Sequence, residues 1–213
     1  MEIERRLQAF GSVPFSHGAL LPMLSSYRRP NDKIAAWLAS GDLMQLRRGL
    51  YVLGSRHRNA ALSLPVVANV LFGPSYVSLD FALGWHALIP EDVVEITSVT
   101  TRRTCQYDTT IGRFSYTHLS ADWYGIGVRM LQNPEGLSFL IASPEKALCD
   151  KVLLTRKLQT LGVASMRTYL LEDLRLDSDA FSSFDLGLFE QCLATGHKPQ
   201  QLTALCRVVR DMR

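Results

Sequence analysis

The residues of this chain best suited to chemistry stand in one block, SPEKALCD, from Ser143 to Asp150. Pro144 predicts a helix that begins here, with the Ser143 hydroxyl as its N-cap and Glu145 near the positive end of the helix dipole. On this helix Lys146 and Asp150 are four residues apart and can pair. Acids and a lysine so close would suit a nuclease, but no second carboxylate at a motif spacing completes a metal site. We therefore expect a capped helix with a surface ion pair worth a few tenths of a kcal/mol.

Other catalytic patterns are missing from the sequence. It contains no GxSxG elbow and no glycine-rich GK[ST] loop, and GlyIleGly at 125–127 lacks the third glycine of a dinucleotide fingerprint. His86 and His118 are expected to be packed or at a sheet edge rather than catalytic. The four cysteines show no CxxC spacing, so free thiols are expected in place of a disulfide or a metal site. We expect no catalytic residue, no cofactor and no metal, and thus a protein that is not an enzyme.

Basic residues are concentrated in the first quarter of the chain. Residues 1–58 hold nine Lys and Arg against four Asp and Glu, whereas residues 59–213 hold 14 against 16. A basic segment on a near-neutral body indicates a polyanionic partner for that segment alone. The residues expected to contact double-stranded DNA are Arg28, Arg29, Asn31, Lys33, Ala36, Arg47, Arg48, Arg56 and Arg58.

The elements that must position these residues lie between Asn31 and Leu53. Ile34, Trp37 and Leu38 have helical spacing, and Gly41 ends the helix, which leaves a face of short polar or basic side chains. The apolar runs 43–46 and 50–53 flank ArgArgGly and predict a β-hairpin with both arginines at its tip. A helix followed by a hairpin with a basic tip is typical of a winged helix-turn-helix domain, here over residues 1–58.

The remainder, residues 59–213, is expected to form a second, mixed α/β domain, so the fold class is α+β. Its strands are predicted at 93–99, 103–109, 113–118, 125–131 and 137–141, as an antiparallel sheet. Its helices are predicted at 62–72, 78–88, 143–154, 162–172, 186–194 and 199–212, so the C-terminal part is helical. In the head, helices are predicted at 2–10 and 17–26 before the one that begins near Pro30.

Several blocks resemble the AbiEi antitoxins of type IV toxin-antitoxin systems, a family linked to phage abortive infection. The similar blocks are residues 27–53, YVSLDFAL at 76–83, residues 96–103, ASPEKALCD at 142–150 and residues 172–177. The resemblance implies a winged-helix transcriptional regulator that binds inverted repeats in its own promoter and represses its operon. It also implies a C-terminal antitoxin domain, with Ser143, Glu145, Lys146 and Asp150 in its motif, that antagonises a nucleotidyltransferase toxin without a stable complex.

Two alternatives stay open at this point: a winged-helix regulator that responds to a small ligand and has no toxin partner, and a nuclease targeted by its basic head. The composition, 47% hydrophobic and 20% charged over 213 residues, is that of a globular protein. No run approaches the roughly 18 apolar residues of a membrane span, and the N-terminus is charged where a signal peptide is apolar. We therefore expect a cytoplasmic protein with no membrane contact.

Overall fold

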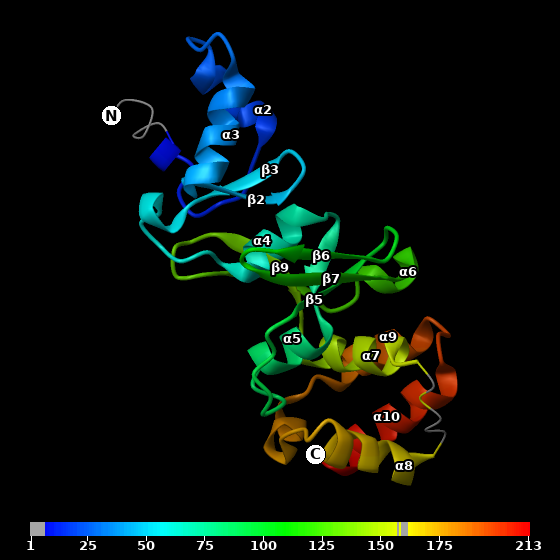
Figure 1. Ribbon diagram of the computed structural model, residues 1–213. Coiled ribbons are helices and arrows are strands. Elements are labelled where there is room, and N and C mark those ends of the chain that lie inside the picture. The colour runs from blue at the N-terminus through cyan, green and yellow to red at the C-terminus, as the bar shows by residue number, and fades with distance from the viewer. Residues whose placement is uncertain (1–6, 157, 159–161) are drawn as a thin grey trace.

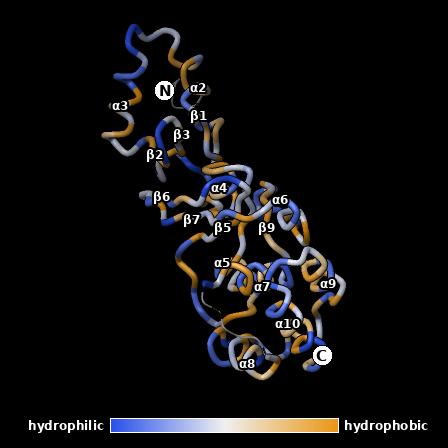
Figure 2. Tube along the Cα trace, turned by 90° about the vertical axis from the view of Figure 1, so that its right-hand side faces the viewer, coloured by the Kyte–Doolittle hydropathy of each residue, from blue (hydrophilic) through white to orange (hydrophobic). Residues whose placement is uncertain are grey.

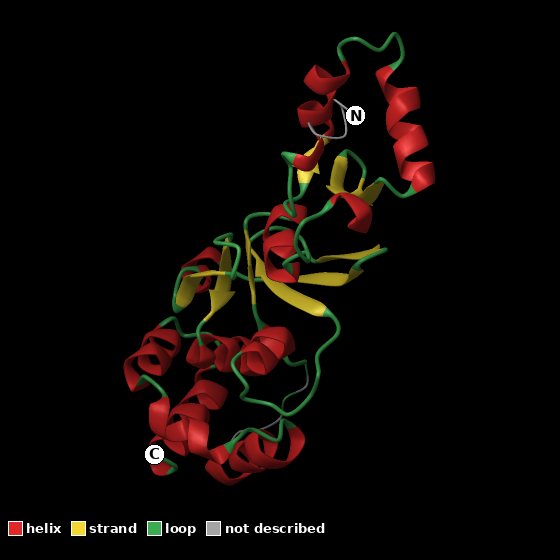
Figure 3. Ribbon diagram, turned by 90° about the vertical axis from the view of Figure 1, so that its left-hand side faces the viewer, coloured by secondary structure: helices red, strands yellow, loops and turns green. Residues whose placement is uncertain are grey.

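The computed structural model describes residues 7–156, 158 and 162–213. An N-terminal head, a central sheet and a layer of helices follow one another along the molecule (Figure 1). The same order is visible in Figure 3, where the strands of the larger sheet lie between the head and the helices. The α+β class is therefore confirmed. The helix expected over 2–10 lies mostly outside the described residues.

The head consists of short helices and a three-stranded sheet. Its elements are β1 (Phe15–Ser16), α2 (His17–Leu20), the 3-10 turn η1 (Leu21–Leu24), α3 (Pro30–Ser40), β2 (Leu43–Arg47), β3 (Leu50–Leu53) and the 3-10 turn η2 (Ser55–His57). The sheet order is β1-β3-β2, and all its pairs are antiparallel. The sequence patterns predicted the hairpin, but β1 was not expected.

The larger sheet has six strands in the order β6-β7-β5-β4-β9-β8. The strands are β4 (Ser75–Val77), β5 (Ile96–Thr100), β6 (Cys105–Thr109), β7 (Gly112–His118), β8 (Val128–Gln132) and β9 (Ser138–Ala142). The expectation of an antiparallel sheet was wrong, because β7 runs parallel to β5 and β9 parallel to β4. The hairpin β6–β7 folds back with its second strand against β5, and β4, which was not expected, joins β5 to β9.

The other helices cover this sheet and form the C-terminal layer. They are α4 (Leu64–Leu71), α5 (Leu79–Trp85), α6 (Ala121–Tyr124), α7 (Pro144–Leu154), α8 (Val163–Thr168), a π-helical turn η3 (Tyr169–Asp173), a 3-10 turn η4 (Ser178–Ser183), α9 (Leu186–Ala194) and α10 (Pro199–Asp211). Helix α7 contacts α5, α9 and α10, so it is the centre of the layer. Figure 2 shows hydrophobic segments through the sheet and the helices beside it.

The described residues contain two hydrophobic cores, and the hairpin of the head contributes to both. All four residues of β3 are buried. Because side chains alternate along a strand, the two faces of the hairpin contact different neighbours. Leu43, Tyr51 and Leu53 pack in the head core, whereas Leu46, Leu50 and Val52 pack in the core of the remaining chain.

Candidate nucleic-acid interface and a buried polar cluster

Helix α3 presents one buried face and one exposed face. Pro30 stands in its first turn, and Gly41 ends it with a left-handed backbone (φ 77°) and an N–H that donates to the Leu38 carbonyl. Ile34 and Trp37 are buried in the head core. The opposite face is exposed and consists of Asp32, Ala35, Ala36 and Ala39. Short side chains on an exposed helix allow its backbone to approach a surface closely.

The residues expected at the start of α3 surround this face. Arg28 and Arg29 lie exposed in the turn before the helix, and the Arg29 guanidinium is 3.7 Å from the Asp32 carboxylate, with both side chains largely in solvent. The Lys33 ammonium lies 5.2 Å from the centre of the Trp37 ring. Arg28, Arg29 and Lys33 therefore place positive charge around the N-terminal half of α3.

A hollow of about 500 Å³ separates α3 from the turn of the hairpin. Its polar lining comes from His17, Asn31 and Arg48, and its apolar lining from Ile34, Ala35, Leu38 and Tyr51. His17 was not expected here. It directly follows Ser16, whose hydroxyl accepts from the Ala19 N–H and caps α2, and its own N–H donates to the Gly49 carbonyl at 2.8 Å. This bond fixes the start of α2 beside the hairpin turn.

The two arginines of the hairpin do not share one environment. Arg47 donates from Nε to the Leu71 carbonyl at the end of α4 (2.9 Å), while Arg48 lines the hollow. The pairing of β2 with β3 shifts between Gln45 and Arg47, and such a bulge re-aims the side chain that follows it. Arg47 is thus hydrogen-bonded to α4, outside the head, and its contact with DNA stays a prediction.

Arg56 lies at the other end of α3. Its Nη2 donates to the Ser40 carbonyl (3.1 Å), which places it at the C-terminal end of the helix, about 16 Å from the turn that carries Arg28. Next to it His57 Nε2 lies 2.7 Å from an Asp42 carboxylate oxygen. Hydrogen bonds from Ser40 and His57 lower the pKa of Asp42. Arg58, half-buried, follows this group, so the structure does not bring Arg56 and Arg58 together with Arg28.

The block from Ser143 to Asp150 is not on the surface, and the expected surface ion pair was wrong. Lys146 and Asp150 are both 0% exposed, and the Lys146 ammonium is 3.1 Å from an Asp150 oxygen. The expected pairing at four residues is present, but α7 is enclosed by α5, α9, α10 and the sheet. Spacing along the helix predicted the contact, and the packing of distant elements buried it.

Asp150 accepts hydrogen bonds from three further side chains. They are the Tyr76 hydroxyl (2.9 Å), the Ser78 hydroxyl (2.6 Å) and the Trp123 indole N–H (2.6 Å). Lys146 also donates to the Trp123 carbonyl at 2.8 Å, and its ammonium lies 4.4 Å from the Trp123 ring. Burial and the Asp150 carboxylate raise the pKa of Tyr76. We call Tyr76, Ser78, Trp123, Lys146 and Asp150 the buried polar cluster; it ties β4, α5, α6 and α7 together.

The start of α7 is fixed by Ser143 and Glu145. The Ser143 hydroxyl accepts from the Lys146 N–H, which confirms the expected N-cap. Glu145 is buried, accepts from the Asp185 N–H at 3.0 Å and has its second oxygen 3.9 Å from the Arg129 guanidinium. Gly127 has a φ of 63°, and a Cβ on it would lie 2.9 Å from the Lys146 Cβ. This close approach requires glycine.

The buried polar cluster and His197 show how the polar side chains of the body bind one another. The buried polar cluster is enclosed, and its groups bind one another. Ser120 and Asp122 both approach the same nitrogen of His197, Nε2, at 3.1 and 3.0 Å, so the imidazole does not bridge them as it does in a catalytic triad. Among the residues that the structure describes, no three His, Cys, Asp or Glu side chains lie close enough to hold a metal ion.

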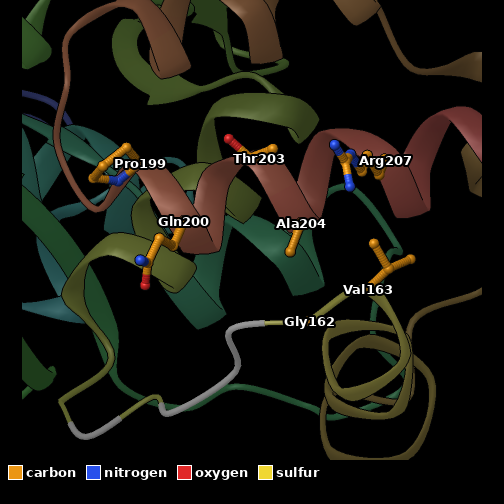
Figure 4. Close-up of a pocket in the computed structure, with 7 residues that line it drawn as sticks. All are labelled: Gly162, Val163, Pro199, Gln200, Thr203, Ala204 and Arg207. Carbon is orange, nitrogen blue, oxygen red and sulfur yellow. The ribbon is translucent and has the colours of Figure 1, made fainter.

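A second hollow, of about 440 Å³, lies between α8 and α10 (Figure 4). Pro199, Gln200, Thr203, Ala204 and Arg207 of α10 line it, together with Gly162 and Val163. It contains one charged side chain, Arg207, and is far along the chain from the head.

No helix in the described ranges combines the length and the apolar character that a membrane crossing needs. The fold and the two sites define a two-part α+β protein, with a basic head and a body braced by buried charges. A comparison of the sequence with protein-family models gives no match, and a comparison with the curated proteins gives none either. The resemblance to the AbiEi antitoxins therefore rests on the sequence blocks quoted above.

Proposed function

We propose that the head is a winged helix-turn-helix domain that binds double-stranded DNA through α3. The observation that carries this proposal is the order of elements: helix α2, helix α3 and a hairpin, with the short strand β1 before α2 pairing with β3. This order places α3 beside a hairpin turn, as a groove-reading helix and its wing require. The sequence patterns suggested the same assignment from the helix and hairpin alone.

The exposed surface of α3 suits the major groove. Ala35, Ala36 and Ala39 keep that face narrow, so the helix backbone can approach the base edges. Arg28 and Arg29 stand at its start, and Arg48 lies across the hollow from Asn31. Phosphate contacts from these arginines would orient the helix, and Asn31 or Lys33 would contact bases.

On this basis we propose that the protein represses its own operon as an antitoxin of a type IV system. The support for the antitoxin role is the resemblance of residues 76–83 and 142–150, and these two blocks supply Tyr76, Ser78, Lys146 and Asp150 of the buried polar cluster. In this proposal the cluster keeps α7 in place, and the surface around α7 acts against a nucleotidyltransferase toxin. A cytoplasmic location is part of the same proposal.

The DNA proposal is tested by gel shifts on the region upstream of the gene. We expect preference for inverted repeats there, and a slope of log affinity against log salt near −4 for about four phosphate contacts per head. The double variant Arg28→Gln with Arg29→Gln should reduce that slope by about 2. The double variant Arg156→Gln with Arg167→Gln removes two exposed arginines outside the head and both hollows; it is the matched control and should change nothing. Equal affinity for random duplex would refute the proposal.

The toxin proposal needs a separate experiment. A neighbouring nucleotidyltransferase gene should arrest growth when expressed alone and should not do so with this protein. The double variant Arg28→Gln with Arg29→Gln, if it retains this protection, would separate the antitoxin role from repression. In the alternative of a ligand-responsive regulator, the hollow between α8 and α10 would be the ligand site. Thr203→Trp, which fills it, would then abolish a response to ligand and leave DNA binding intact.

A further inference from the structure

The six-stranded sheet has two edges, and they differ in what lies beside them. One edge is β6, which contacts β2 of the head. The other edge is β8, the hairpin partner of β9. A strand at an open edge presents backbone N–H and C=O groups that another strand can bind. The direction of these groups along β8 follows from the bonds at its two ends.

The odd-numbered residues of β8 form backbone hydrogen bonds with β9. The Ser143 N–H donates to the Gly127 carbonyl (2.8 Å) and the Asn133 N–H donates to the Leu137 carbonyl (3.0 Å), on either side of β8. In an antiparallel pair, successive residues direct their backbone groups alternately toward the partner and away from it. The even-numbered residues Val128, Met130 and Gln132 therefore direct their N–H and C=O groups away from β9.

The contacts of Leu140 agree with this direction. Leu140 is the β9 residue opposite Met130. Its N–H donates to the Asn69 side chain (2.6 Å) and its carbonyl accepts from that side chain (3.4 Å), so both groups are used on the side away from β8. Met130 and Leu140 are thus a non-hydrogen-bonded pair. In the part of the chain that the structure describes, no backbone hydrogen bond engages the outward groups of Met130.

The centre of this edge is apolar. Met130 is 70% exposed, and Leu140 beside it is 37% exposed on the same face of the sheet. Open edges of monomeric proteins usually carry lysine, proline or a bulge that prevents pairing. β8 has none of these at its centre, and its one charged residue, Arg129, points to the other face.

We propose that β8 pairs with β8 of a second copy of this chain, antiparallel and with the two-fold axis at Met130. In this register Met130 lies opposite Met130, and Val128 of each copy lies opposite Gln132 of the other. The outward N–H and C=O groups of Val128, Met130 and Gln132 in both copies then pair, which gives about six backbone hydrogen bonds. Leu140, both Met130 side chains and the second Leu140 form one apolar strip. Arg129 lies opposite Leu131, whereas a register with Arg129 opposite Arg129 would place like charges together.

The result is a closed, isologous dimer with one continuous sheet and two heads. A symmetric pair of heads is what an inverted repeat in DNA would require. The pairing itself does not depend on the DNA proposal, since none of the residues proposed to contact DNA lies in β8 and the assay contains no DNA.

The test is the mass of the full chain in solution, measured by light scattering on a sizing column. The wild type should elute with twice the 23.9 kDa of one chain at about 50 μM, for a dissociation constant in the micromolar range. Met130→Pro should be monomeric: the Met130 N–H points outward, so proline removes the contact between copies and spares the ladder with β9. Met130→Lys should weaken association at least about tenfold.

Val94→Lys is the matched control, because Val94 is 79% exposed but lies outside the strands, and it should remain dimeric. Urea unfolding confirms that each variant is folded. If Met130→Pro is unfolded, Met130→Lys decides. A wild type that is monomeric up to about 200 μM would overturn the pairing, as would folded Met130 variants that dimerise like the wild type. A monomeric Met130→Lys that still shifts a half-site would leave the DNA proposal standing.

Discussion

Replacing Asp150 by asparagine should be among the most damaging conservative changes in this protein. Asp150 is 0% exposed and accepts from Tyr76, Ser78 and Trp123 as well as from the Lys146 ammonium. Asparagine keeps one acceptor oxygen but turns an NH₂ group toward donors. It also leaves Lys146 as a buried charge without its counter-ion, which costs about 3–5 kcal/mol.

The partner substitution should cost less, and the difference is the sharper test. In Lys146→Met the Asp150 carboxylate keeps three neutral donors, each a charge-assisted bond worth about 1.5–3 kcal/mol. We therefore expect a loss of about 1–3 kcal/mol. The double variant should lose less than the sum of the two single variants, because neither charge is then buried alone.

The free energies come from urea unfolding at pH 7, with equal m-values required for the comparison. Lys151→Met is the control, since Lys151 is on the same helix and pairs with Asp80 at 2.6 Å, but both side chains are partly exposed. Its loss should stay below about 1 kcal/mol. An Asp150→Asn loss below about 1 kcal/mol would show that the buried charges do not brace the fold, and a larger loss in Lys146→Met would contradict the expected order of the two variants.

Three further predictions follow from single contacts. Gly127→Ala should lose about 1–3 kcal/mol on unfolding, because the new Cβ meets Lys146 in a left-handed backbone; a neutral result would contradict the close approach. Arg47→Gln should lower stability by about 1 kcal/mol, because it removes the hydrogen bond to the Leu71 carbonyl. Arg48→Gln should lower DNA affinity and leave stability unchanged. The reverse pattern would show that the bulge does not separate the roles of the two arginines. Burial lowers the pKa of His86 from its ordinary 6.5, so protonation favours the unfolded chain. The free energy of unfolding should therefore fall as the pH drops from about 6.5 to the pKa of His86 in the folded chain. His86→Gln should remove this dependence in unfolding curves measured from pH 7 to 5.

Local patterns predicted much of the head correctly. Helix α3 begins at Pro30 and ends before Gly41, as expected, and the apolar runs around ArgArgGly form the hairpin. These features depend on residues that are neighbours in the chain, where backbone preference and side-chain spacing decide the structure. The N-caps at Ser16 and Ser143 follow from the same local rules.

The direction of each strand and the environment of each charge depended on segments far apart in the sequence. β4 is only three residues long and has little pattern of its own, yet its position between β5 and β9 creates one of the two parallel pairs of the sheet. Arg47 and Arg48 are adjacent, but only the bulge in β2 and the position of α4 separate their roles.

The block from Ser143 to Asp150 shows both contributions. The sequence determined that Ser143 caps a helix and that Lys146 and Asp150 meet one turn apart, because both follow from helix geometry. Only the tertiary structure decided that the pair is enclosed by Tyr76, Ser78 and Trp123, which come from 74, 72 and 27 residues away from Asp150. Spacing along a helix carries no information about burial; the elements packed around it do.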